Sequence, residues 1–228
     1  MKPGWTIAVV CTGVLCLTTP AFPASITGSE VIERMQKSFE KSKTFSAAFE
    51  KQLYWAVLDK NVSRSGRIHT RKPSEFRLEI DDYVVVGDGD AVWTYAPENE
   101  QVIVSSYNRD LPTPWEILVE HSEQFRPVAV TEVELEGRPC YAVVMASKSV
   151  HSTTGDRVEG MTVWIDKKRW HLLMVEQTEA NENVTTYVLS RHRVNDKIDD
   201  DLFFFNPPSG VEVIDRRAPD PAVTLEAQ

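Results

Sequence analysis

The chain has 228 residues, of which 42% are hydrophobic, and a formal net charge of −9 at pH 7. This length is enough for one domain with a sizeable hydrophobic core. The acidic balance and the lack of a basic tract argue against binding to nucleic acid or to anionic lipid surfaces.

The first 24 residues have the pattern of a secretory signal peptide. Lys2 precedes an uncharged, mainly apolar stretch at residues 5–17, and small residues follow up to Ala24. The apolar stretch is shorter than the roughly 20 residues that a membrane-spanning helix needs. We therefore expect cleavage near Ala24 and export to the periplasm.

Cleavage leaves a single folded domain, which we expect over residues 25–215, and a flexible tail over residues 216–228. Two of the three cysteines lie in the signal peptide, so only Cys140 remains. An intramolecular disulfide is therefore excluded, and stability must come from the hydrophobic core.

One helix is predicted to open the domain. Ser29 is the expected N-cap, and the helix should stop around residues 42–44. Apolar residues recur on one face at a spacing of three and four, namely Val31, Ile32, Met35 and Phe39.

The apolar period then changes to two, which predicts β-strands. We expect strands at 45–57, 65–70, 75–80, 83–86, 91–95, 101–105, 128–134, 140–147, 159–166, 171–179, 184–194 and 211–214. A short helix is predicted within residues 112–124. So many strands do not stay flat in one open sheet, and a curled antiparallel sheet encloses volume for apolar helices.

Motifs of enzymes and metal sites are missing from the sequence. It contains no G-x-S-x-G, Walker loop or H-E-x-x-H, and its five histidines have no metal-ligand spacing. The Gly-Asp-Gly-Asp run at residues 87–90 is interpreted as a hairpin turn, since the other ligand positions of a calcium loop are absent. We therefore expect a binding protein with no catalytic activity, cofactor or metal.

Several segments, in order along the chain, resemble motifs of the LolA family of periplasmic outer-membrane lipoprotein carrier proteins. They are FSAAF at residues 45–49, SGRI at 65–68, KPSEFR at 72–77, VGDG at 86–89, VWTY at 92–95, EQV at 100–102, TP-W-E-IL at 113–118 and FFF-N-P-P-S-G-V-E-V at 203–213. The similarity spans nearly the whole chain after the signal peptide.

The resemblance implies a mainly β fold, in which an incomplete antiparallel β-barrel of about 11 strands carries an N-terminal helix and a short helical lid. It also implies a function. An apolar cavity takes acyl chains of lipoproteins from an inner-membrane ABC exporter, and an outer-membrane receptor accepts them. We expect a monomer.

In the LolA family an arginine before the motif proline hydrogen-bonds the lid backbone and holds the empty form closed. Lys72 stands at that position here, with Arg71 beside it, so either residue is a candidate lid latch. Lysine lacks the guanidinium fork of arginine.

Eight apolar residues are candidates to line the cavity: Phe39, Phe45, Phe49, Phe76, Trp93, Trp115, Ile117 and Leu118. Ordinary core packing is the alternative for each of them. A second alternative concerns the cargo, because a LolA-like carrier or sensor of another lipid or amphiphile would use the same kind of cavity.

Overall fold

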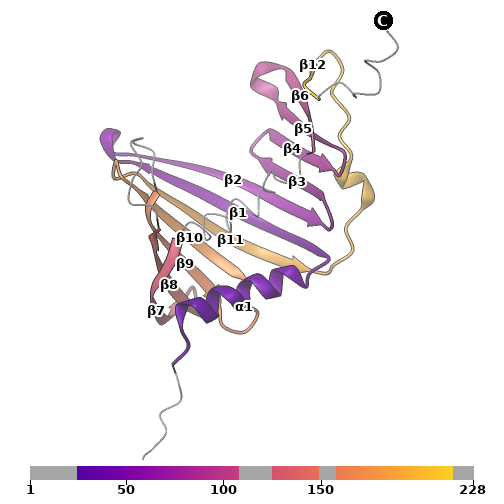
Figure 1. The fold of residues 1–228 in the computed structure, drawn as a ribbon. Coiled ribbons are helices and arrows are strands. Elements are labelled where there is room, and N and C mark those ends of the chain that lie inside the picture. The colour runs from indigo at the N-terminus through magenta and orange to yellow at the C-terminus, as the bar shows by residue number, and fades with distance from the viewer. Residues whose placement is uncertain (1–24, 108–124, 149–157, 218–228) are drawn as a thin grey trace, which may run out of the picture.

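The computed structural model describes residues 25–107, 125–148 and 158–217 of the chain. These residues form one large curved sheet with a helix, α1, along one end of it (Figure 1). The predicted signal peptide, the predicted helix within residues 112–124 and most of the predicted tail lie outside the described residues. None of the helices in the described part has the length and hydropathy to cross a membrane.

Helix α1 (Gly28–Glu40) begins with a reciprocal capping box. The hydroxyl of Thr27 accepts a hydrogen bond from the Glu30 backbone N–H at 3.2 Å, and the Glu30 carboxylate accepts one from the Thr27 N–H at 2.8 Å. Thr27 is therefore the N-cap. The prediction of Ser29 was wrong, because the T-x-x-E box satisfies two orphan donors at once.

Twelve strands make up the sheet, one more than the expected number of about 11. They are β1 (Thr44–Trp55), β2 (Lys60–Arg71), β3 (Glu75–Ile80), β4 (Tyr83–Asp88), β5 (Ala91–Ala96), β6 (Gln101–Ser106), β7 (Phe125–Leu135), β8 (Arg138–Ser147), β9 (Val158–Asp166), β10 (Leu172–Glu179), β11 (Val184–Val194) and β12 (Glu212–Asp215). Three short 3-10 helices accompany them: η1 (Ala56–Leu58), η2 (Pro97–Asn99) and η3 (Asp200–Phe203).

The strand order is β12-β6-β5-β4-β3-β2-β1-β11-β10-β9-β8-β7. Every neighbouring pair is antiparallel except β12 and β6, which run parallel. The edge strands β12 and β7 do not pair with each other, so the sheet is open. The prediction of a mainly β fold with an incomplete barrel is confirmed.

The two faces of the sheet have separate apolar cores. Paired residues on neighbouring strands share a face, and successive residues alternate between faces. We call the face against which α1 packs the helix face, and the other the opposite face. The helix-face core joins three residues of α1 with thirteen of the sheet, and its members are Val31, Ile32, Met35, Phe45, Ala47, Ile68, Phe125, Tyr141, Val143, Met145, Met161, Val163, Ile165, Leu172, Val175 and Leu189.

A smaller core lies on the opposite face of β5 and β6. Its buried members are Ala91, Val102 and Val104, against which Trp93, Tyr95, Phe205 and Val211 pack. The chain after η3 therefore covers this face. Phe203, the last residue of η3, is itself only 1% exposed. Arg216, at the predicted start of the tail, still donates a backbone hydrogen bond to Val104 O at 2.7 Å.

Candidate functional site

Helix α1 spans the helix face from β7 and β8 to β1. Its first residue, Gly28, lies so close to the sheet that a Cβ there would be 2.9 Å from Pro127 Cβ and 3.2 Å from Val143 Cγ1. At the other end, the rings of Phe39 and Phe45 meet edge to face with centroids 5.9 Å apart. The two candidates thus lie together where α1 reaches β1.

Lys72 holds the C-terminal end of α1. Its ammonium group donates hydrogen bonds to Phe39 O at 3.1 Å and to Glu40 O at 2.5 Å, and lies 5.3 Å from the Phe39 ring centroid. A cation at this end of a helix is favourable, because the last carbonyls have no partner within the helix. Lys72 therefore binds the backbone of α1, whereas the predicted latch contact with the lid helix involves a segment outside the described residues.

Phe49 and Phe76 each lie across a glycine of the neighbouring strand on the helix face. A Cβ at Gly66 would be 2.4 Å from Phe49 Cζ, and one at Gly87 would be 2.3 Å from Phe76 Cε1. Their positions in the register agree, because Phe49 pairs with Gly66 and Phe76 with Gly87. Only glycine leaves room for a ring to lie on the adjacent strand in this way.

The interior beneath the end of α1 is almost filled. A cavity of about 10 Å³ remains there, which is room for about one water molecule. Its lining consists of Met35, Ser38, Phe39, Ser42, Phe45, Trp170, His171, Leu172 and Val194. Side chains of α1, namely Met35, Ser38 and Phe39, line what space is left.

His171 lines this cavity and stacks on His192, and the sequence did not mark either histidine as a site residue. The rings of His171 and His192 stack with centroids 5.4 Å apart, and His192 Nε2 lies 2.8 Å from Leu172 O. Burial lowers the pKa of both rings. Their separation along the chain left no local signal, because the contact arises only from the packing of β11 beside β10.

Trp93 lies on the opposite face, away from the expected cavity. Its neighbours in the register, Val86 and Val104, share that face. Trp93 Nε1 donates to Asp88 Oδ2 at 3.1 Å, and its ring centroid is 6.2 Å from that of Phe205. The structure therefore places Trp93 in the small core under the C-terminal segment.

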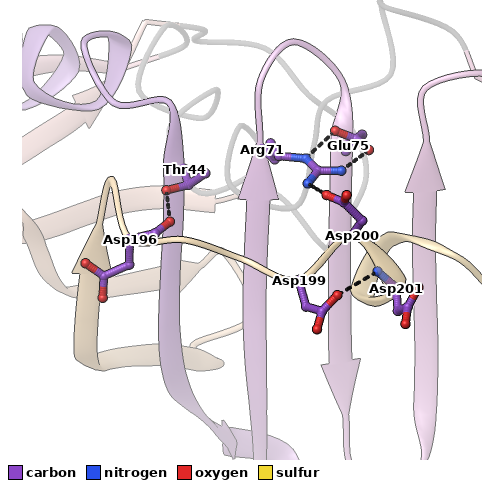
Figure 2. Close-up of polar contacts among 7 residues, drawn as sticks. All are labelled: Thr44, Arg71, Glu75, Asp196, Asp199, Asp200 and Asp201. Atoms are coloured by element: carbon purple, nitrogen blue, oxygen red, sulfur yellow. Dashed lines mark hydrogen bonds and ion pairs between the residues drawn. The ribbon is translucent and has the colours of Figure 1, made fainter.

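Arg71 also lies on the opposite face. Its guanidinium donates two hydrogen bonds of 2.6 Å to Glu75 and a further one to Asp200, and lies 4.6 Å from the Phe203 ring centroid (Figure 2). The hydrogen bonds to these carboxylates raise the pKa of Arg71. Arg71 thus holds the C-terminal segment instead of α1.

The acidic run before and within η3 serves local contacts. Thr44 Oγ1 donates to the backbone oxygen of Asp196 at 2.7 Å, and the Asp199 carboxylate accepts from the Asp201 N–H at 3.3 Å (Figure 2). Within the described ranges no three acidic, histidine or cysteine side chains gather as they would around a metal ion. The remaining candidates Trp115, Ile117 and Leu118 lie outside those ranges.

Comparisons with known proteins agree with this fold. The family model of the outer membrane lipoprotein carrier protein LolA matches residues 40–206. An outer-membrane lipoprotein carrier protein of Nitrosomonas europaea is 27% identical over 209 residues, which cover 88% of this chain and 96% of that protein.

Two uncharacterized proteins are also similar. One, from Methanocaldococcus jannaschii, is 23% identical over 190 residues, which cover 81% of this chain. The matched part spans only about half (53%) of that protein. The other is a crystal structure from Thermus thermophilus, with a TM-score of 0.55 and 15% identity over 82% of this chain and 98% of that one. This last likeness concerns the fold alone.

Proposed function

Since the chain belongs to the LolA family of outer membrane lipoprotein carrier proteins, we propose that it binds lipoprotein acyl chains on the helix face and carries them through the periplasm. In this proposal the cargo comes from an ABC exporter in the inner membrane and passes to a receptor at the outer membrane. The protein acts by binding and release and catalyses no reaction.

The observation that carries the proposal is the way α1 fills the helix face. Met35 and Phe39 belong to α1 and line the cavity of about 10 Å³ together with Phe45 of β1. Apart from α1, every described element around this space is a strand or a turn. An amphipathic helix that occupies the mouth of an open sheet is suited to give way to an apolar guest.

The free energy of acyl transfer favours a site that the protein's own side chains refill when it is empty. Exposure of one chain of about 16 carbons to water costs on the order of 12 kcal/mol, at ~0.8 kcal/mol per CH₂. A carrier must offer nearly the same free energy as the bilayer and still release the chains. Side chains of α1 that refill the site lower the net affinity by the cost of displacing them, so release needs no ATP at the receptor.

The opening step follows from the contacts at the end of α1. Lys72 binds the last carbonyls of the helix, and Phe39 packs on Phe45. When these contacts break, the C-terminal half of α1 lifts and exposes Phe45 and the neighbouring apolar residues of the helix face. The guest then takes the place of Met35 and enters between the lifted half of α1 and the sheet, where Phe39 and Phe45 still line its path.

Analysis of the natural cargo tests the proposal. The full-length protein is isolated from periplasm, and its co-purifying ligands are identified by mass spectrometry. Diacylglyceryl-cysteine peptides are the expected result. A single free lipid would instead assign the carrier to another amphiphile, and a preparation free of any lipid or acylated peptide would overturn the proposal.

A further inference from the structure

The opposite face of β1, β2 and β11 is hollowed into a groove of about 480 Å³. Its floor is made by two small residues of β1, Ser46 and Ala48. On one side Ser46 pairs with His69 and Ala48 with Arg67, and on the other Ser46 pairs with Arg193. Short side chains between two rows of long ones produce the hollow. We call it the basic groove.

The cations of the basic groove form no ion pair with any carboxylate in the part of the chain that the structure describes. Arg67, Arg191, Arg193 and Lys197 line it, and among the described residues none of them lies within 4.0 Å of a carboxylate oxygen. Among the described residues, two carboxylates line the same hollow, those of Glu79 and Asp196. One of these, Glu79, already accepts a hydrogen bond from Arg77 at 2.6 Å. The groove is therefore locally positive in a chain whose net charge is −9.

A bulge in the backbone of β11 sets the position of one of these cations, Arg191. The pairing of β11 with β1 shifts its register between Ser46 and Ala48, and Arg191 lies in this bulge with a φ of 52°. Left-handed backbone is strained for a residue other than glycine, and asparagine tolerates it better than arginine. Such bulges and strained residues concentrate at functional sites, where they aim a side chain.

One end of the basic groove is fixed in position. Asp196 O accepts a hydrogen bond from Thr44 Oγ1 at 2.7 Å, and Leu202 O accepts one from Arg77 Nη1 at 3.3 Å. The ion pair of Arg71 with Asp200 holds the segment between them (Figure 2). The groove thus exists before any ligand arrives, which lowers the entropic cost of binding.

We propose that the basic groove binds a small anionic ligand that carries phosphate or carboxylate groups. Guanidinium groups bind such groups through paired, charge-assisted hydrogen bonds. The volume lies within the range of about 300–1,000 Å³ that is usual for small-molecule sites. A lipid headgroup and a free phosphate ester share this chemistry. The sheet separates the groove from α1, so this site does not depend on acyl binding at the helix face.

Calorimetric titration of the full chain with pyrophosphate and with glycerol 3-phosphate tests whether the ligand is a free, soluble anion. Sedimentation with phosphatidylglycerol vesicles, and with phosphatidylcholine vesicles as reference, tests the headgroup. We expect saturable binding that weakens with salt, and at least a 10-fold loss of affinity in Arg67→Gln and in Arg193→Gln. Arg64→Gln is the matched control, because Arg64 lies on the same strand but pairs with Asp81 at 3.1 Å. The affinity of the Arg64→Gln variant for the anion should not change.

Arg191→Gly separates ligand binding from a structural role. Glycine relieves the positive φ, so this variant should melt at a higher temperature than the wild type and still bind the anion at least 10-fold more weakly. Binding to free anions identifies a soluble ligand, and binding to phosphatidylglycerol vesicles alone identifies a headgroup. The proposal is overturned if the wild type binds neither, or if Arg64→Gln loses as much affinity as the groove variants.

Discussion

Lys72 closes the last turn of α1 by donating a hydrogen bond of 2.5 Å to the backbone oxygen of Glu40. The two residues come from different parts of the fold, since Lys72 directly follows β2 and Glu40 is the last residue of α1. The contact joins the edge of the helix face to the helix that fills it. In the proposed carrier it is the contact that must break first.

Replacement of Lys72 by leucine should loosen the end of α1. Loss of the hydrogen bonds to the last carbonyls costs about 1 kcal/mol, so backbone amides in the last turn of α1 should exchange with solvent roughly 5-fold faster. Hydrogen exchange with mass spectrometry measures this. Lys60→Leu is the control, because Lys60 is an exposed residue at the far end of β2. Equal exchange in wild type and Lys72→Leu would contradict a latch.

Gly66 and Gly87 should respond differently to substitution by alanine. Each change overpacks the helix face and should destabilise the fold by about 2 kcal/mol in urea unfolding. At Gly87 the three atoms nearest to a Cβ all belong to the Phe76 ring, the nearest at 2.3 Å. Phe76→Leu should therefore make Gly87→Ala less costly.

At Gly66 the same rescue should fail. A Cβ there would lie 2.3 Å from the backbone oxygen of Glu79 as well as 2.4 Å from the Phe49 ring. Backbone of a paired strand cannot move aside as a side chain can, so Phe49→Leu should leave the cost of Gly66→Ala largely in place. Equal rescue at both glycines would show that the rings alone determine the effect.

Strand positions could be predicted from the sequence, but face assignments could not. The predicted strands at 75–80 and 184–194 match β3 and β11 in their bounds, because alternation of apolar residues is a local signal. In β5 both faces are partly apolar, with Val92 on one and Trp93 on the other. Which of them faces α1 depends on a C-terminal segment that covers Trp93, and local pattern does not contain that information.

The candidate site was predictable only where its residues act locally. Phe49 and Gly66 could each be recognised as parts of motifs, but their contact requires the register of β1 and β2. The basic groove had no sequence signal at all. Arg67 and Arg193 are distant in the chain, and both border β1 only because β1 pairs with β2 on one side and with β11 on the other.

A charge placed at the end of α1 should weaken acyl binding. Phe39→Glu introduces a carboxylate beside the cavity that Phe39 lines, and a buried charge opposes entry of an apolar chain. Displacement of a fluorescent fatty acid should weaken at least 10-fold. Phe204→Glu is the matched control, since Phe204 is 65% exposed and should tolerate the change. Unaltered displacement in Phe39→Glu would argue against this site.

Stability should fall as the pH drops below about 6.5, the ordinary value for histidine. Burial is the main cause that lowers the pKa of His171 and of His192 in the folded state, and Arg169 and Arg138 act in the same direction while Asp166 opposes them. The unfolded chain then binds protons that the folded chain does not, so each histidine favours unfolding in acid. Full stability is present above pH 6.5 and is lost as the pH falls toward the lowered pKa values of the folded state.

Urea unfolding between pH 5 and 8 measures how steeply the stability depends on pH. The double variant His171→Asn with His192→Asn should flatten it, leaving the part due to His69, whose pKa is also lowered by burial. An unchanged slope in the double variant would show that these stacked rings do not set the acid sensitivity.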